Sequence, residues 1–447
     1  MPTVHIPLQA IKGRGLAQHQ PHRFERDARE AFDDGWGAFD DAVQARDEAP
    51  PPATEVSFED AKSAITHNDS PDIGFRLGLN PYRGCEHGCV YCYARPSHSY
   101  LNLSPGIDFE TKLIAKRNIA QVLQRELASP RHVPELLAIG TVTDAYQPIE
   151  RELRLMRGVL QVLSDTRHPL AIVTKGSGVE RDIDLLAPMA AQGLAAVYVT
   201  ITSLDAKLTR LLEPRAAAPH RRLRTIRTLA EAGIPVGVSV APQIPFINDD
   251  MEQVLEAAFE AGARRAFYTV LRLPHELSPM FRQWLELHYP DRAARVMARV
   301  QEMRGGRDYN ADFAQRMKGS GVWADLIRQR FEKTCDRLGY AREREPLNTS
   351  LFTPQAVRAQ QELGVQSWFS GLRRSQSSTR ADTQIVSVQR GVVKFCPIVE
   401  WSNKDIHYYL QNNNLPYRAS SSPCRSQTSS AAERSRKPQP DLEKHVS

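Results

Sequence analysis

Two features are missing from this sequence: a long apolar run and an apolar leader. No window approaches the roughly 18 apolar residues of a membrane span, and the N-terminal stretch MPTVHIPLQAIKGRG lacks the apolar core of a signal peptide. Cysteine is also scarce, since the 447 residues include only six, at irregular spacing that does not resemble a secreted disulfide framework. We therefore expect a soluble cytoplasmic protein that does not interact with a membrane.

Acidic residues are in the minority. The chain has 58 Lys and Arg residues against 52 Asp and Glu, a net charge of +6 and a pI of about 9.0. This balance permits a polyanionic partner such as nucleic acid without requiring one. In the basic helical pattern at 221–233, i, i+3 spacing places Arg221, Arg224 and Arg227 on one face. A solvated face is favoured there over a phosphate-binding stripe.

Apolar residues are sparse at both ends of the chain. Residues 1–74 are polar, charged and Pro-rich, as in DEAPPPATEVSFED, and predict a partly disordered N-terminal arm. Order is expected to begin near FRLGLNPYRGC. Residues 419–447 are rich in Ser, Arg and Pro and predict a disordered tail.

Between these ends the chain alternates short apolar runs with amphipathic helical patterns. The runs that predict strands lie at residues 76–82, 136–142, 170–174, 195–201, 235–241 and 265–271. Such a series demands parallel strands joined by helical crossovers. We expect an α/β fold, a partial (β/α)6 TIM-like barrel that covers residues 75–345 together with its following helices. A doubly wound open sheet is the alternative.

Three of the six cysteines, Cys85, Cys89 and Cys92, fall within the stretch NPYRGCEHGCVYCYARPSHSY. A structural zinc site needs four ligands. His87 or His98 is a candidate for the fourth, which would make the protein a zinc-stabilised nucleic-acid-binding module. A four-iron cluster held by three thiolates instead keeps one iron open for a substrate or cofactor. The spacing C-x3-C-x2-C, without a second pair of cysteines, favours the iron–sulfur cluster.

The motif GCEHGCVYCYA resembles the C-x3-C-x-aromatic-C signature of radical S-adenosylmethionine (SAM) enzymes. Flanking motifs resemble the branch related to spore photoproduct lyase, over about residues 75–340: TDAYQPIE, IVTKGSG, VTITSLD, LEPRA and VAPQIPFIND. The resemblance implies a lyase-like enzyme in which Cys85, Cys89 and Cys92 bind a [4Fe-4S] cluster and SAM binds the open iron. An electron from a donor such as flavodoxin or ferredoxin would split SAM to give a 5′-deoxyadenosyl radical. The substrate is unknown, and DNA or another nucleic acid is the first candidate.

Polar residues follow the predicted strands, where barrels carry their working residues. The resemblance assigns Asp144 and Gln147 to contacts with SAM or the substrate. Lys175 is suited to pair with the SAM carboxylate, Ser203 to bond its amino or ribose groups, and Tyr91 lies in the loop that packs against adenine. Each has a plainer alternative. Asp144 would shape a turn, Lys175 would open a helix, Ser203 would cap one, and Tyr91 would pack in the core.

One cysteine expected of photoproduct lyases is missing from the sequence. Those enzymes use a cysteine near the end of an early strand as a hydrogen donor, and GTVTDAYQPIE contains none. A substrate other than spore photoproduct is therefore expected.

Residues 346–418 predict a separate small α/β piece, of which 358–418 resemble the second half of phosphoadenylyl-sulfate (PAPS) reductases. The resemblance implies that Arg373 and Arg374 help to hold nucleotide sulfate or phosphate groups. The SGGKDS-like phosphate loop and the ECGLH cysteine motif of that family have no counterpart, and Cys424 does not match. We expect an incomplete appendage, with a fusion related to sulfonucleotide (PAPS) reductase as the alternative function.

Overall fold

The computed structural model describes residues 52–343 and 346–354 as two unbroken stretches. It also describes residues 11, 13–16 and 20–25, three strands at 367–369, 386–389 and 392–395, and residues 400, 402, 405, 408, 409 and 412. The chain forms two compact units, residues 1–359 and 360–447. Among the described residues, no helix is both long enough and apolar enough to span a bilayer.

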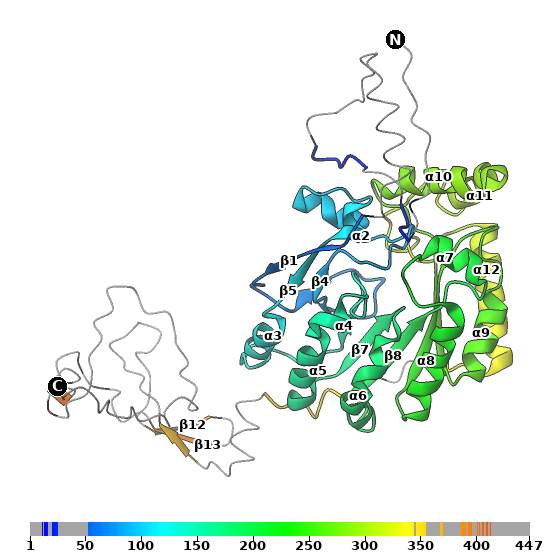
Figure 1. The fold of residues 1–447 in the computed structure, drawn as a ribbon. Coiled ribbons are helices and arrows are strands. Elements are labelled where there is room, and N and C mark those ends of the chain that lie inside the picture. Colours follow the sequence, from blue (N-terminus) through cyan, green and yellow to red (C-terminus); the bar gives the residue numbers. More distant parts are fainter. Residues whose placement is uncertain are drawn as a thin grey trace, which may run out of the picture. The chain divides into compact units, whose positions relative to one another are not determined.

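A seven-stranded sheet forms the centre of the first unit (Figure 1). Its six parallel strands are β3 (Leu77–Leu79), β6 (Leu137–Ile139), β7 (Leu170–Thr174), β8 (Ala195–Thr200), β9 (Val236–Gln243) and β10 (Arg265–Val270). β2 (Thr66–His67) adds an antiparallel edge to β3. The parallel strands are neighbours in chain order, whereas a doubly wound sheet reverses its order at a switch point. The expected partial (β/α)6 barrel is confirmed.

Helices follow the strands and cover the outer face of the sheet (Figure 1). They are α3 (Ile119–Leu127), α5 (Leu155–Thr166), α6 (Ile183–Ala190), α8 (Pro219–Glu231), α9 (Met251–Glu260) and α12 (Val322–Leu338). Within this series α3 contacts α5, α5 contacts α6, α8 contacts α9, and α9 contacts α12. The remaining elements are η1 (Arg95–Leu101), α2 (Asp108–Thr111), α4 (Glu150–Leu153), η2 (Ser177–Asp182), α7 (Ala206–Leu212), α10 (Leu277–His288) and α11 (Pro290–Glu302).

The two faces of the parallel strands carry side chains of different size. On the outer face, Ile139 and Ile172 belong to the main apolar core under the helices. On the inner face, Ala138, Ala171 and Ala196 line a cavity. Bulky branched residues usually fill the interior of a TIM barrel. Here small side chains leave a cavity of about 1120 Å³.

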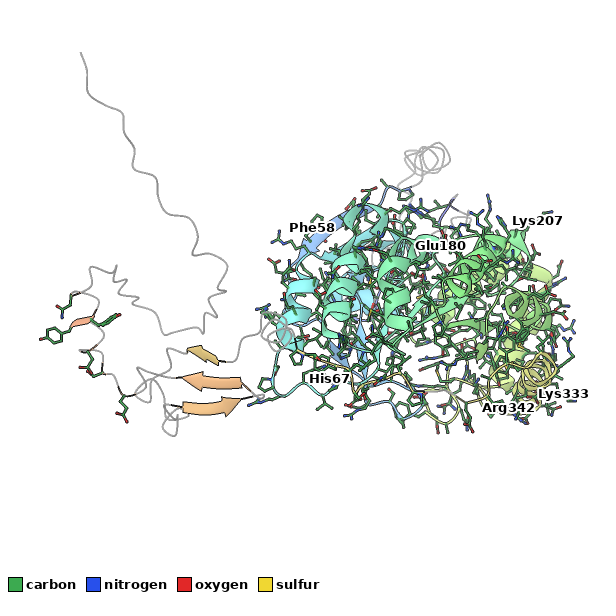
Figure 2. The ribbon with its side chains drawn as sticks, turned by 90° about the horizontal axis from the view of Figure 1, so that it is seen from below. Phe58, His67, Glu180, Lys207, Lys333 and Arg342 are labelled. Atoms are coloured by element: carbon green, nitrogen blue, oxygen red, sulfur yellow. The ribbon has the colours of Figure 1, made fainter. Side chains whose placement is uncertain are left out.

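A second sheet, of three strands, brings the N-terminal part of the chain onto the first unit. β1 (Glu55–Glu59) pairs in parallel with β5 (Lys112–Lys116), and β5 pairs antiparallel with β4 (Tyr82–Arg83). Phe58 of β1 is exposed at the margin of the unit (Figure 2). The ordered fold therefore begins before residue 75, earlier than the polar composition indicates.

The second unit contains a small sheet in the order β11-β13-β12. β11 (Ser367–Phe369) pairs in parallel with β13 (Val392–Phe395), which pairs antiparallel with β12 (Val386–Gln389). These strands lie within the segment for which a small α/β piece is expected. The predictions for Arg373 and Arg374 and for the tail at 419–447 lie outside the described residues.

Candidate active site

The three clustered cysteines lie in residues 84–94, here called the cysteine loop, between β4 and η1. Cys85 and Cys89 are buried, Cys92 is partly exposed, and all three are free thiols that line the inner cavity. Gly84 and Gly88 have φ angles of +78° and +67°, in the left-handed region that glycine adopts most easily. These two glycines let the chain turn tightly enough to bring three thiols to one cavity.

Gln147 holds the backbone on both sides of Cys85. Its amide oxygen accepts from the Glu86 N–H at 2.8 Å, and its amide nitrogen donates to the Gly84 carbonyl at 3.2 Å. The Cys85 N–H in turn donates to the Phe109 carbonyl at 2.9 Å. Gln147 is buried, so the structure gives it a part in positioning the loop, beside its predicted contact with SAM or substrate.

Arg95 and Glu110 form an ion pair beside the cysteine loop. Their side chains are both 0% exposed, and the two charged groups lie 2.5 Å apart. Nε of Arg95 donates to the Cys89 carbonyl at 2.8 Å. Because the pair is enclosed, the loss of either member would leave a buried charge without its partner. The pair therefore fixes the middle of the loop.

The motif LEPRA contacts the cysteine loop from the end of α7. The Arg215 guanidinium pairs with Glu86 at 3.0 Å, and the Leu212 carbonyl accepts from the Val90 N–H at 3.0 Å. Ile149, from the motif TDAYQPIE, donates its N–H to the same Glu86 side chain at 2.7 Å. Two motifs that the sequence singles out therefore support the loop that carries the thiols.

Asp144, predicted to contact SAM or to shape a turn, lies beyond the C-terminal end of β6. Its Oδ1 accepts from the Thr174 hydroxyl at 2.7 Å, and its Oδ2 accepts from the Lys175 N–H at 2.6 Å. Oδ2 also lies 3.3 Å from Nδ1 of His87 in the cysteine loop. Burial alone would raise the pKa of this carboxyl, but His87 and the other donors hold the pKa well below its ordinary value. Asp144 thus joins β6, β7 and the cysteine loop.

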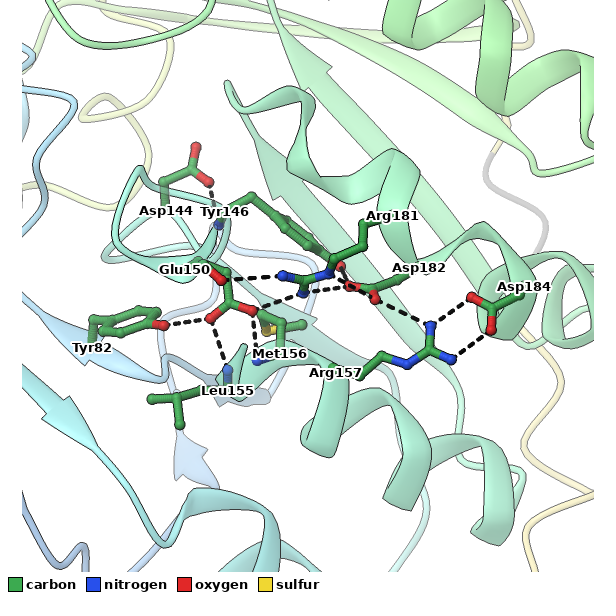
Figure 3. Close-up of polar contacts among 10 residues, drawn as sticks. All are labelled: Tyr82, Asp144, Tyr146, Glu150, Leu155, Met156, Arg157, Arg181, Asp182 and Asp184. Atoms are coloured by element: carbon green, nitrogen blue, oxygen red, sulfur yellow. Dashed lines mark hydrogen bonds and ion pairs between the residues drawn. The ribbon is translucent and has the colours of Figure 1, made fainter. Parts of the chain in front are cut away.

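A buried polar network continues from this turn toward β4 (Figure 3). The Tyr146 hydroxyl donates to Asp182 at 3.0 Å. Arg181 pairs with Asp182 at 2.9 Å and with Glu150 at 2.8 Å. Glu150 also accepts from the hydroxyl of Tyr82, which stands just before the cysteine loop. The network holds the segment after β6 against the strand that leads into the loop.

Lys175 and Tyr91, both predicted to contact SAM, lie together on the cavity wall. Nζ of Lys175 is 5.8 Å from the centre of the Tyr91 ring. The Tyr91 hydroxyl donates to Glu213, which forms an enclosed ion pair with Arg222. Burial alone would lower the pKa of Lys175, but the Cys89 sulfur, when ionised, and the carboxylates of Glu213 and Asp144 raise the pKa above its ordinary value. Lys175 therefore presents a cation to the cavity at neutral pH.

Ser203 lies outside the set of described residues that line the cavity. Its hydroxyl donates to Asp250 at 2.9 Å and accepts from the Asp205 N–H at 3.0 Å. Asp205 is itself the cap of α7 and accepts from the Lys207 N–H at 2.7 Å. The structure places Ser203 beside a helix cap, and its contact with SAM stays a prediction.

The basic helix α8 has two different faces. Arg224 and Arg227 are exposed, Arg221 is partly exposed and pairs with Glu180, and Arg222 is 1% exposed. The solvated face stays a prediction. Sequence reasoning missed the buried ion pair that Arg222 forms. A signal for it exists in the spacing, since Arg222 lies four residues before Ile226 and seven before Leu229, which are both buried.

Cationic side chains also line the cavity beyond β10, namely Arg272, Arg316 and Lys318. Nζ of Lys318 lies 3.3 Å from the centre of the Tyr268 ring and donates to the Tyr268 carbonyl at 2.8 Å. Arg316 pairs with Asp72 at 2.6 Å, which links the segment after α11 to the loop between β2 and β3. Sequence reasoning missed this group, because these residues belong to no motif and meet only in the fold.

The zinc alternative required a histidine close to the thiols. His98 points elsewhere, since its Nε2 contacts the Lys112 carbonyl at 3.0 Å and its ring packs edge-on against Phe109. His87 contacts Asp144, as described above. Within the part of the chain that the structure describes, no three His, Cys, Asp or Glu side chains are gathered closely enough to hold a metal ion in this conformation, and this includes the three thiols of the cysteine loop.

Two family models match the chain, and the second match begins within the first structural unit. The Radical SAM superfamily matches residues 79–258, and the phosphoadenosine phosphosulfate reductase domain matches residues 293–419. An uncharacterized protein of Mycobacterium tuberculosis is 36% identical over 246 residues, which are 54% of this chain and 72% of that protein. The phosphoadenosine 5′-phosphosulfate reductase of Vibrio cholerae is 58% identical over 60 residues, which are 13% of this chain and 24% of that enzyme.

Solved structures of spore photoproduct lyase are also similar. One mutant has a TM-score of 0.46 and 15% identity, over 63% of this chain and 79% of the other. Another, with bound SAM and dinucleoside spore photoproduct, has a TM-score of 0.41 and 16% identity over 63% and 78%. The family match over the cysteine loop and the long alignment with the mycobacterial relative identify the family. The chain belongs to the radical SAM superfamily, whose domain implies a [4Fe-4S] cluster and SAM as cofactors.

Proposed function

We propose that this protein is an enzyme that cleaves SAM reductively at a [4Fe-4S] cluster and uses the resulting 5′-deoxyadenosyl radical on a substrate in the inner cavity. The observation that carries the proposal is the position of three free thiols, Cys85, Cys89 and Cys92, on the wall of one cavity of about 1120 Å³. Such a cavity has room for SAM and part of a substrate beside the thiols.

The cysteine loop supplies the three free thiols that a cluster with three protein ligands needs. Cys85, Cys89 and Cys92 would each hold one iron, which leaves the fourth iron for SAM. Cys335, the remaining described cysteine, packs in the apolar core of α12 instead. Burial raises the pKa of Cys85, and it raises the pKa of Cys89 to about 12. The buried sulfurs therefore need a nearby cationic centre to be charged, and bound iron supplies one.

The residues around the loop would bind and orient SAM and keep water from it. A bound, reduced [4Fe-4S] cluster would supply the one electron needed to split SAM into methionine and the 5′-deoxyadenosyl radical. Lys175 offers its ammonium group to the SAM carboxylate, and Tyr91 offers its ring face to the adenine. Asp144 acts as a positioning residue, because it holds the Lys175 backbone. Ser203 supports the start of α7 near the same site.

We infer that the substrate is anionic, with nucleic acid as the first candidate class. Arg272 and Lys318 bring positive charge to the cavity wall, where Arg316 is paired with Asp72, and the chain as a whole carries a net charge of +6. Arg and Lys are the side chains that contact phosphate groups in nucleic-acid complexes. An unrelated anion would be recognised by the same groups, so salt dependence alone does not identify the substrate.

A second candidate function is the reduction of PAPS. The match of residues 293–419 to the phosphoadenosine phosphosulfate reductase domain favours it. The chain spans about a quarter of the Vibrio cholerae reductase, which leaves most of that enzyme without a counterpart in the alignment. Thioredoxin-dependent release of sulfite from PAPS by the full-length protein would support this function.

The radical SAM proposal is tested by release of 5′-deoxyadenosine from SAM. The protein is reconstituted anaerobically with iron and sulfide and reduced with dithionite. Cys92→Ala removes one proposed ligand, and Cys335→Ala is the matched control, because it removes a buried thiol from α12. We expect product from the parent and from Cys335→Ala, and none from Cys92→Ala. A parent that binds zinc, holds no iron and releases no product would contradict the proposal.

A further inference from the structure

The N-terminal segment, for which the sequence predicts a disordered arm, contacts the cysteine loop through its described residues. The closest approach is between Gly15 and Gly88. A Cβ atom added at Gly15 would lie 1.8 Å from the Gly88 carbonyl oxygen, so a larger residue would have to displace one of the two segments. The Gly15 N–H also donates to the Glu110 carboxylate at 2.9 Å. Glycine at position 15 is therefore required for this contact.

Glu110 connects the segment to the loop. Its buried carboxylate pairs with Arg95, and Arg95 donates to the Cys89 carbonyl at 2.8 Å. Arg14 adds a second contact, since its guanidinium donates to the Glu110 carbonyl at 3.0 Å. A continuous set of buried and partly buried hydrogen bonds thus leads from residues 14 and 15 to the backbone of one of the three thiol residues.

Leu16 extends the contact with an apolar side chain. It is buried in the same apolar cluster as Cys89, Val90 and Tyr91. The segment therefore contacts the cysteine loop with both polar and apolar groups.

Residues 20–25 anchor the segment farther along. The Arg23 guanidinium pairs with Glu276, just before α10, at 2.9 Å. Gln20 accepts through its carbonyl from the Ser104 hydroxyl at 2.9 Å, and its N–H donates to that same hydroxyl at 2.9 Å. Two further points on the barrel unit therefore hold the chain that carries Gly15.

We propose that residues 13–16 position the cysteine loop and shield it from water, and that Gly15 is the positioning residue that permits this close packing. The inference rests on the proposed function, because the loop is taken to hold the [4Fe-4S] cluster. Hydrogen bonding and solvent exposure around the ligands govern how firmly a cluster is held and at what potential it is reduced. Displacing the segment therefore makes the cluster more labile while all three thiols remain.

Gly15→Ala tests the inference, and Gly13→Ala is its matched control. Gly13 belongs to the same segment, and an added Cβ there meets no atom within 4 Å. Its φ of +76° strains any larger residue, so Gly13→Ala controls for backbone strain in the segment without a clash. The full-length proteins are reconstituted anaerobically, and the loss of the visible cluster absorbance in air is timed. We expect the absorbance of Gly15→Ala to decay about tenfold faster than that of the parent and of Gly13→Ala, from the same initial iron content. Equal decay rates would overturn the inference.

A second variant and a second measurement distinguish the proposed effect from a folding defect. Leu16→Ala removes apolar contact without a clash, and it should also speed the decay. Limited proteolysis of the metal-free proteins reports on the segment directly, and we expect faster cleavage near residue 15 in Gly15→Ala than in Gly13→Ala. Unchanged cleavage and decay in both Gly15→Ala and Leu16→Ala would overturn the inference. A parent that binds no iron would instead overturn the proposed function, which separates the two failures.

Discussion

The carboxylate of Asp144 lies 3.3 Å from Nδ1 of His87, which stands between Cys85 and Cys89 in the chain. The same carboxylate accepts from the Lys175 N–H at 2.6 Å. One buried group thus joins the loop that carries the thiols to the strand end that carries the cavity cation. The relative position of thiols and cation therefore depends on this residue.

Asp144→Asn keeps the shape of the side chain and removes its charge. We expect the free energy of unfolding at neutral pH to fall by about 2–4 kcal/mol, because a buried, charge-assisted contact is lost. The pKa of Asp144 is lowered in the folded state. Its contribution is therefore complete above the pKa of the unfolded chain, about 3.9, and is lost as the pH falls below that value. Urea unfolding at neutral and acidic pH should show the difference between parent and variant shrinking in acid.

The two adjacent arginines of α8 should respond differently to substitution. Arg222→Gln leaves Glu213 buried without its cation and is expected to cost about 3–5 kcal/mol of unfolding free energy. Arg221→Gln removes a partly exposed pair with Glu180 and is expected to cost less than about 1 kcal/mol. Chemical denaturation of both variants checks this contrast, and similar costs would refute the assignment of the buried pair.

Ala195 and Ala196 of β8 provide a test of the two faces of the sheet. Ala195→Leu would crowd the filled core under the helices and should cost about 1–3 kcal/mol. Ala196→Leu would place its side chain in the cavity and should change stability little, while it weakens SAM binding and 5′-deoxyadenosine release. Thermal unfolding and ligand titration of the two variants separate the effects. A strongly destabilised Ala196→Leu would mean that the cavity is not open space.

The free energy of unfolding should depend on pH through a pair of histidines, His132 and His168. Nε2 of His132 lies 3.0 Å from Nε2 of His168, and the ring of Phe352 packs against both. Burial, with a contribution from His132, lowers the pKa of His168 to about 4. The pKa of His132 is also lowered, by burial, although Glu126 and Glu135 act in the opposite direction.

Because the unfolded chain binds a proton at His168 more readily than the folded protein, stability is full above about pH 6.5 and is lost as the pH falls toward about 4. The loss from His168 alone amounts to about 3 kcal/mol. Urea unfolding across this range should show a flatter dependence for His168→Gln than for the parent. Parallel curves for the two proteins would refute this role of the pair.

The fold could be predicted in large part from the sequence, because its strands are continuous apolar runs. The run at 170–174 coincides with β7, and the order of the runs along the chain is the order of the parallel strands in the sheet. β1 at Glu55–Glu59 could not be predicted in this way. Its residues alternate between polar and apolar within a Pro-rich segment, and its partner β5 lies more than fifty residues later.

The candidate site was less predictable than the fold. The spacing of Cys85, Cys89 and Cys92 is a local signal in the sequence, and it predicts the cluster of thiols directly. Gln147 and Glu213 contact residues that lie elsewhere in the sequence. The residues next to them in the chain therefore do not predict these contacts. The same limit applies to Gly15, whose requirement for glycine arises only from the approach of Gly88 in the folded chain.

The outer face of the parallel strands packs the core and the inner face lines the cavity. This difference determines which substitutions the fold tolerates. The large aliphatic side chains that hold the barrel together point outward, and the alanines on the inner side contribute little to cohesion. A mutation that replaces one of these alanines by a larger apolar residue therefore reshapes the cavity at small thermodynamic cost. Single substitutions on the inner wall can therefore change which molecules the cavity accepts while the fold stays intact.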